Sequence, residues 1–270
     1  MCGSGRGQVL IPWPNRIEDG RYEFAGGSHQ LPIDEPERRN AIHGLVRWEA
    51  WTAGEREPGR VVMEHLLHPR PGYPFSLALS IEYSLSDDGL TVVTTATNAG
   101  ADACPYGAGA HPYLTLGTPT VDSLIVHAAA RTVLRSDDRG LPVSEEAVDG
   151  TEYDFRQPRL LGRTKLDHAL ADLERDRDRL ARVELTDPES GEGLTLWADE
   201  AYPYLQLFTG DPLPDVARRS IAVEPMTCPP NAFRTGKNVI RLEPGRSFTS
   251  VWGLAPTSSR RGDARPSAPL

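Results

Sequence analysis

Cysteine is scarce in this chain of 270 residues, and basic charge is in deficit. The three cysteines, Cys2, Cys104 and Cys228, are odd in number and show no C-x-x-C spacing. This pattern disfavours both a disulfide framework and a structural zinc site. Lys and Arg number 29 against 38 Asp and Glu, a net charge of -9, which disfavours a nucleic-acid partner.

Long apolar runs are also missing. The first residues, MCGSGRGQVL, include no apolar core of a signal peptide. No later stretch approaches the roughly 18 consecutive apolar residues that indicate a membrane helix. We therefore expect a cytoplasmic protein with no membrane partner.

Strand patterns take the place of long, strongly periodic helices. Three segments, 60–68, 75–84 and 90–98, are rich in β-branched and aromatic residues and are separated by turns, which predicts an antiparallel meander. His65 and His68 stand three residues apart at the end of the first segment. On a strand this spacing directs their rings to opposite faces, so we interpret them as surface residues and not as metal ligands.

Further strands are expected near 121–135, over 193–210 and as a final hairpin in NVIRLEPGRSFTSVWGL. The segment KLDHALADLERDRDRLARVEL combines leucines at helical spacing with a charge-dense centre, which fits either a helix or a solvated loop. The predicted fold class is all-β, with stacked antiparallel sheets in one domain over residues 1–255. A disordered tail is expected over 256–270.

Glu224 is the most unusual acidic residue, in IAVEPMTCPPNAF. The apolar residues Ile221 to Val223 predict the end of a buried strand, and the prolines that follow remove backbone donors. Glu224 is therefore expected where a strand gives way to a rigid loop, with its carboxylate held in one direction. Cys228 beside it is expected to be a small buried side chain.

Two further stretches place polar residues on rigid loops. In LIPWPNRIEDGRYEF, a Pro-Trp-Pro bend precedes Asn15 and Arg16, and a planar guanidinium suits a polyhydroxylated or anionic ligand. In AIHGLVRWEAW, Gly44 after His43 allows close backbone approach, and Trp48 and Trp51 have a spacing compatible with a strand.

His111 and Asp167 complete the candidate set. His111 lies in CPYGAGAHPYLTL, where small residues permit close packing and Pro112 and Tyr113 restrict the chain after it. Asp167 lies on a Leu166-Asp167-His168 corner, where its local role would be to cap a helical turn.

The five candidates Arg16, His43, His111, Asp167 and Glu224 all lie at expected strand-to-loop junctions, where β-sandwich proteins place their sites. A carboxylate with histidines, without a set of metal ligands or a Ser-His-Asp arrangement, suits proton transfer at a neutral organic substrate. Tryptophans near the same loops suit the apolar faces of a sugar ring.

Several motifs occur in the order seen in aldose 1-epimerases, the galactose mutarotase-like family. They are Asn15-Arg16-Ile17, His43-Gly44, Gly109-Ala110-His111-Pro112-Tyr113, Leu166-Asp167-His168, Leu205-Gln206-Leu207-Phe208-Thr209-Gly210 and Glu224-Pro225. The chain resembles this family over about residues 8–254. The resemblance implies a β-supersandwich fold and the interconversion of α and β anomers of a free sugar, without a cofactor or a metal ion.

The resemblance also implies residue roles. Glu224 resembles the general base on the anomeric hydroxyl, His111 the acid that protonates the ring oxygen, and His43 a second histidine near that oxygen. Arg16 and Asp167 resemble the groups that hold the sugar hydroxyls, and Asn15 is expected to join them.

One departure and two alternatives accompany the resemblance. Members of the family usually carry several strands before the Asn-Arg-Ile stretch, whereas Arg16 lies near the start here, and a sheet without those strands is expected to self-associate at its exposed edges. One alternative is an epimerase of a phosphorylated or other anionic hexose, with Arg38, Arg39 and Arg47 as candidate anion-binding residues. The other is a carbohydrate-binding protein without catalysis, against which the presence of both Glu224 and His111 speaks.

Overall fold

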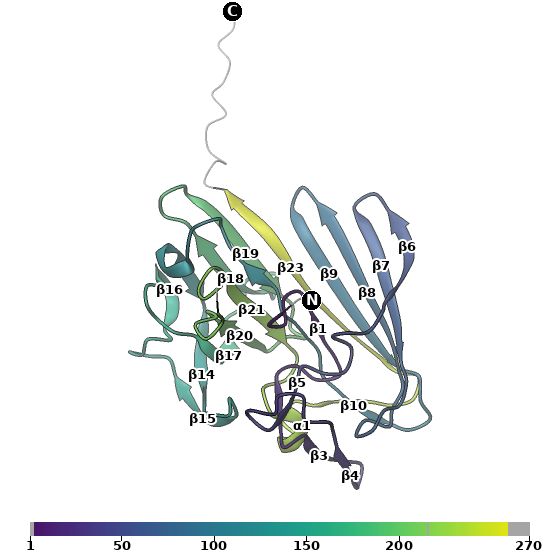
Figure 1. Cartoon of the computed structure of the whole chain (residues 1–270). Helices are drawn as coiled ribbons and strands as arrows, with labels where there is room; N and C mark the ends of the chain where they lie inside the picture. Colours follow the sequence, from purple (N-terminus) through teal and green to yellow (C-terminus); the bar gives the residue numbers. More distant parts are fainter. Residues whose placement is uncertain (1–2, 215, 259–270) are drawn as a thin grey trace, which may run out of the picture.

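Two large antiparallel sheets dominate the computed structural model, which describes residues 3–214 and 216–258 (Figure 1). The eight-stranded sheet contains, in spatial order, β1 (Val9–Leu10), β11 (Gly109–Ala110), β21 (Ile221–Met226), β20 (Tyr204–Phe208), β17 (Asp167–Leu173), β14 (Ala130–Ser136) and β15 (Pro142–Ala147), with β12 (Tyr113–Leu114) also paired to β21. The nine-stranded sheet contains β16 (Phe155–Leu160), β13 (Ile125–Ala128), β18 (Ala181–Thr186), β19 (Glu192–Ala198), β23 (Ser247–Ser258), β9 (Gly89–Asn98), β8 (Leu77–Ser86), β7 (Arg60–Leu67) and β6 (Thr52–Glu57).

Smaller elements lie beside these sheets. Three two-stranded pairs are β2 (Arg16–Glu18) with β5 (Asn40–Ile42), β3 (Arg21–Phe24) with β4 (Gly27–Gln30), and β10 (Cys104–Tyr106) with β22 (Ile240–Leu242). The helices of the described residues are short, a 3-10 turn η1 (Val121–Ser123) and α1 (Ala232–Thr235). None of them is long and apolar enough to span a membrane.

The main hydrophobic core lies between the two large sheets. Val133 and Val223 of the eight-stranded sheet belong to the same buried cluster as Val126 and Leu196 of the nine-stranded sheet. Along β9 and β18, buried residues alternate with less buried ones, as a strand with one covered face requires. The structure therefore confirms the predicted all-β class, and the predicted meander corresponds to β7, β8 and β9.

Two local predictions were wrong because tertiary pairing overrides local spacing. The segment with helical leucine spacing forms no helix but β17 and β18, which belong to different sheets, and Asp167 begins β17 and caps no helix. Its charge-dense centre, residues 174–180, forms a loop, as the second of the two expectations for this segment had it. The expected final hairpin does not form, because β22 pairs with β10 whereas β23 lies between β9 and β19.

Boundaries and loops also differ from expectation. β23 continues to Ser258, which pairs with Glu192, so order extends beyond the predicted domain end at residue 255. Residues 259–270 of the predicted tail lie outside the described residues. Trp48 and Trp51 lie in the turn and loop after β5 and not on a strand.

The edges of the two large sheets are formed by β1, β15, β6 and β16. Self-association at such edges stays a prediction.

Candidate active site

A cavity of about 610 Å³ brings the predicted site residues together. It is lined by strands of the eight-stranded sheet and by the loops around β2 and β5. All six residues expected from the sequence line it, namely Asn15, Arg16, His43, His111, Asp167 and Glu224. The described chain therefore joins positions that are more than two hundred residues apart in the sequence.

Three neighbouring strands present polar side chains to this cavity by simple alternation. In β21, Ile221 and Val223 enter the core between the sheets, so Glu224 faces the opposite side. The same alternation in β20 directs Gln206 to the cavity, directly across from Glu224 in the ladder. Asp167 of β17 joins them, because the Gln206 amide Nε2 donates to Asp167 Oδ1 at 2.8 Å.

Glu224 lies inside a strand and not at its end, which corrects the expected junction. β21 continues through Pro225 to Met226. The Val223 N–H donates to Pro112 O at 3.2 Å, so the missing N–H of Pro225, two residues later, faces the same side. On that side β21 pairs with β12 up to Ala222 and with β11 only at Met226, so Pro225 lies in the gap between these two partner strands. Its missing N–H therefore costs no hydrogen bond between the strands. The proline therefore fits within the strand, and Glu224 is buried, with only 2% of its surface exposed.

Reciprocal contacts between two loops fix His43. The His43 N–H donates to Asn15 O at 2.8 Å, and the Asn15 N–H points at His43 Nδ1 at 3.2 Å. Both residues have left-handed backbones, with φ of 55° and 61°, an arrangement that costs about 1–3 kcal/mol each and is typical of functional sites. Gly44 allows the approach, because a Cβ there would lie 2.1 Å from Ile11 O.

This contact determines the proton position on His43. Burial, followed by the nearby His111, Arg47 and Arg16, lowers the pKa of His43 well below its usual value, so the ring is neutral. Because Nδ1 accepts the Asn15 N–H, the single ring proton lies on Nε2. His43 is therefore a hydrogen-bond donor through Nε2.

His111 and Glu224 form the central pair. His111 Nε2 lies 3.3 Å from Glu224 Oε1, and both side chains are almost fully buried. Burial lowers the pKa of His111 to about 3, and Arg6 and Arg47 act in the same direction against an opposing backbone hydrogen bond. Burial raises the pKa of Glu224 well above its usual value, and Asp167 adds to this rise while Arg16 opposes it. The pair thus favours two neutral groups over two ions.

Arg16 is already engaged by a carboxylate that the sequence did not single out. Its Nε and Nη2 donate to both oxygens of Glu35 at 2.8–3.2 Å. Of the three arginines considered for anion binding, Arg38 and Arg47 line the cavity and Arg39 does not. Arg47 is paired with Asp34 at 2.5 Å.

His43, His111 and Glu224 also form a group with the composition of a metal site, their nearest ligand atoms lying within 4.8 Å of one another. Bond lengths of about 2.0–2.2 Å to zinc would bring such atoms to roughly 3.5 Å apart. Neutral His43 offers no free lone pair, since Nδ1 accepts a hydrogen bond and Nε2 carries the proton. The three side chains as arranged therefore do not fit a zinc ion.

We expect that prolonged treatment with EDTA leaves the rate of sugar anomer exchange, the activity that the resemblance implies, within twofold of the untreated rate. The reason is that the neutral His43 offers no lone pair to a metal ion. Rate measurements before and after dialysis against the chelator check this. Loss of activity on dialysis, with recovery on addition of one divalent ion, would contradict it.

Several lining residues were missed in the sequence. Gln206 had a signal, as a lone amide within an apolar run, and its Oε1 is buried without a partner among the described residues, as is Glu224 Oε2. Tyr113 stacks on the His111 ring at 4.9 Å between centroids. Trp48, one of the tryptophans expected near these loops, lies exposed at the cavity. Glu35 had no signal, because it lies in a loop where charged residues are frequent.

Comparison with known proteins assigns the chain to a family. The family model described as Aldose 1-epimerase matches residues 3–254. YihR of Escherichia coli K12, itself uncharacterized, is 38% identical over 251 residues, which cover 92% of this chain and 79% of YihR. YphB of the same organism, also uncharacterized, is 28% identical over 252 residues, covering 91% of this chain and 81% of YphB.

Solved structures share the fold. A GalM/aldose epimerase homologue from C. elegans superposes with a TM-score of 0.85 at 18% identity, covering 95% of this chain and 84% of the homologue. Galactose 1-epimerase from Lactobacillus acidophilus NCFM gives a TM-score of 0.80 at 20% identity, covering 95% and 81%. These likenesses establish a galactose mutarotase-like fold for the described chain.

Proposed function

The chain belongs to the aldose 1-epimerase family, and on this premise we propose that it is a mutarotase that interconverts the α and β anomers of a free hexose by acid-base ring opening. The observation that carries the proposal is the buried pair of His111 and Glu224, 3.3 Å apart with their pKa values displaced in opposite directions. The cavity of about 610 Å³ is within the usual range for small-molecule sites, about 300–1,000 Å³.

Ring opening needs one proton removed and one supplied. The reactive form of the pair is the one in which its single proton lies on His111. In this form the Glu224 carboxylate takes the proton of the C1 hydroxyl, His111 gives its proton to the ring oxygen, and the bond between C1 and that oxygen breaks. Rotation about the C1–C2 bond then presents the other face of the aldehyde, and the reverse transfers close the ring. The pair holds one proton throughout, so charge and atoms balance.

The electrostatics favour this sequence of proton transfers. Burial disfavours the ionised form of the pair, with a carboxylate and an imidazolium, from which ring opening starts. Ring opening turns it into a neutral carboxyl and a neutral imidazole, the forms that burial favours at Glu224 and His111. His43 contributes as an Nε2–H donor near the ring oxygen, since its Nδ1 accepts the Asn15 N–H and its single proton lies on Nε2.

Hydroxyl recognition is assigned to Arg16, Asp167 and Asn15, as expected from the sequence, together with Gln206. The Oε1 of Gln206 is a buried acceptor without a partner among the described residues, and a sugar hydroxyl would supply the missing donor. Trp48, which is exposed at the cavity, offers an aromatic face for the C–H surface of the ring.

The charges of the lining favour a neutral sugar over an anionic one. Apart from the pair at Glu224, the cavity is lined by the carboxylates Asp34, Glu35, Glu37 and Asp167 and by the arginines Arg16, Arg38 and Arg47. Two of these arginines are already paired with Glu35 and Asp34. Comparison of kcat/KM for glucose and glucose 6-phosphate in a polarimetric assay tests this, and a clear preference for the phosphate would favour the alternative epimerase.

Asp167→Asn should raise KM for the sugar by about 10- to 100-fold with a smaller effect on kcat, because a hydrogen bond to a charged group is worth about 1.5–3 kcal/mol. Initial rates over a range of sugar concentrations separate KM from kcat. Asp102→Asn is the matched control, since Asp102 is exposed outside the cavity. An unchanged KM in Asp167→Asn would remove Asp167 from the sugar site.

A further inference from the structure

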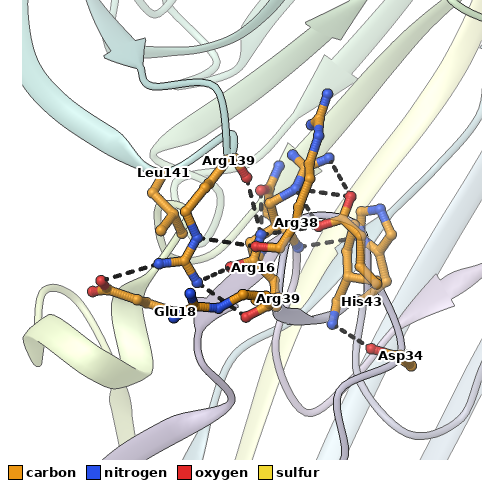
Figure 2. Close-up of polar contacts among 12 residues, drawn as sticks. Arg16, Glu18, Asp34, Arg38, Arg39, His43, Arg139 and Leu141 are labelled. Carbon is orange, nitrogen blue, oxygen red and sulfur yellow. Dashed lines mark hydrogen bonds and ion pairs between the residues drawn. The ribbon is translucent and has the colours of Figure 1, made fainter.

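Arg139 lies outside the cavity lining, in the turn between β14 and β15, yet it holds the loop that borders the cavity (Figure 2). Its Nε donates to Arg38 O at 3.0 Å, and its Nη2 donates to Arg39 O at 3.0 Å and to Asp19 Oδ1 at 2.8 Å. Its Nη1 lies 3.5 Å from a carboxylate oxygen of Glu18, on β2. One side chain thus fastens β2 and the loop before β5 to the edge of the eight-stranded sheet.

Asn40 connects Arg139 to the sugar site. Asn40 is fully buried, and its Oδ1 accepts a hydrogen bond from the side-chain Nη2 of Arg139 at 3.3 Å. Its Nδ2 donates to the backbone carbonyl of Arg139 at 2.9 Å and to Glu35 Oε2 at 3.0 Å. Glu35 in turn binds the guanidinium of Arg16 through both carboxylate oxygens. A continuous series of hydrogen bonds therefore runs from Arg139 through Asn40 and Glu35 to Arg16.

Gly140 makes a second, direct connection from the same turn. A Cβ at this position would lie 2.7 Å from Arg16 Nη1 and 2.9 Å from its Cζ. Its backbone is left-handed, with φ of 73°. The backbone of the turn thus lies against the guanidinium, at a distance that leaves no room for a side chain.

We propose that Arg139 and Gly140 are positioning residues of the sugar site, which fix the guanidinium of Arg16 from outside the cavity. The role of Arg16 in sugar binding rests on the proposed function, whereas the claim that the turn fixes Arg16 does not. A guanidinium held by Glu35 on one side and by the turn on the other is preorganised, so a sugar hydroxyl meets a donor that needs no further ordering.

The test measures Arg16 itself. The ¹⁵N side-chain spectrum should show the Arg16 Nε–Hε signal, identified by its loss in Arg16→Met. We expect its solvent exchange to be slow in the wild type and at least about tenfold faster in both Arg139→Met and Gly140→Ala. Arg139→Met removes the side-chain hydrogen bonds to Asn40 Oδ1 and to the carbonyls of Arg38 and Arg39, and the Cβ added in Gly140→Ala would displace the Arg16 guanidinium. Arg131→Met, which removes an exposed arginine of β14 paired with Glu174, is the control and should leave the signal unchanged.

Kinetics add a readout that general destabilisation would not give. Arg139→Met should raise KM about tenfold with kcat within twofold, and should not raise KM further in an Arg16→Met background. An unchanged Arg16 signal in both Arg139→Met and Gly140→Ala overturns the proposal, as does an equal KM rise with and without Arg16. Absence of anomer exchange in the wild type overturns the proposed function instead, while the Arg16 signal still decides the positioning claim. If Arg139→Met does not fold, Gly140→Ala decides it.

Discussion

Glu224→Gln should lower kcat for anomer exchange by about 10²- to 10⁴-fold while KM for the sugar changes little. Glutamine has nearly the same shape as glutamate, but its amide cannot take the proton of the C1 hydroxyl. Glu224 is buried and engages no lysine or arginine in an ion pair within the described chain, so the neutral amide should be accommodated. Initial rates and sugar binding by calorimetry measure the two quantities separately.

The control for this substitution is Glu243→Gln, which makes the same chemical change at an exposed ion pair with Arg241. It should leave kcat unchanged. Thermal melting of both variants checks that each is folded. A Glu224→Gln rate within about tenfold of the wild-type rate would show that Glu224 is not the base.

His111→Asn should cost more rate than His43→Asn, and both should cost far more than His65→Asn or His68→Asn. His111 lies against Glu224 and, in the proposed mechanism, supplies the proton to the ring oxygen, so its loss should remove an acid worth about 10²- to 10⁴-fold. In the same mechanism His43 is a neutral donor, so its loss should remove a hydrogen bond and no proton transfer, an effect of about tenfold. Rates for the four variants, at sugar concentrations above KM, give the ranking.

The choice of asparagine keeps this comparison interpretable. Asparagine tolerates the left-handed backbone that His43 adopts, so His43→Asn should keep the loop geometry. His65 and His68 lie on and after β7, away from the cavity lining. Equal losses in all four variants would mean that removing a histidine merely destabilises the protein, and would contradict the assigned roles.

The fold class and the residues that line the candidate site could be predicted from the sequence, because they depend on local patterns. Period-two alternation in β8 and β9 is visible in the chain, and so are Glu224 in an apolar run and His111 between small residues and a proline. Gly44 was correctly expected at a close backbone approach, now seen against Ile11 O. Cys228 was correctly expected to be buried.

The remaining features depend on which segments pair in space. Leu170 has helical spacing from Leu166, but its strand forms ladders with β14 and β20, and pairing decides the outcome. Glu35 is one of several charged residues in its loop, and only the folded chain shows that it holds Arg16. Arg139 is more than a hundred residues from Arg16 in the sequence, and its connection through Asn40 has no local signature.

The most direct test of the central claim is polarimetry of freshly dissolved α-glucose and α-galactose with the wild-type protein, beside the same amount of the Glu224→Gln variant. We predict that the wild-type protein accelerates the decay of optical rotation to its equilibrium value, without added metal or cofactor, and that the variant gives a rate at least about a hundredfold lower after subtraction of the spontaneous rate. A wild-type protein that is folded, binds neither sugar and leaves the spontaneous rate unchanged would contradict the assignment as a mutarotase of free hexoses.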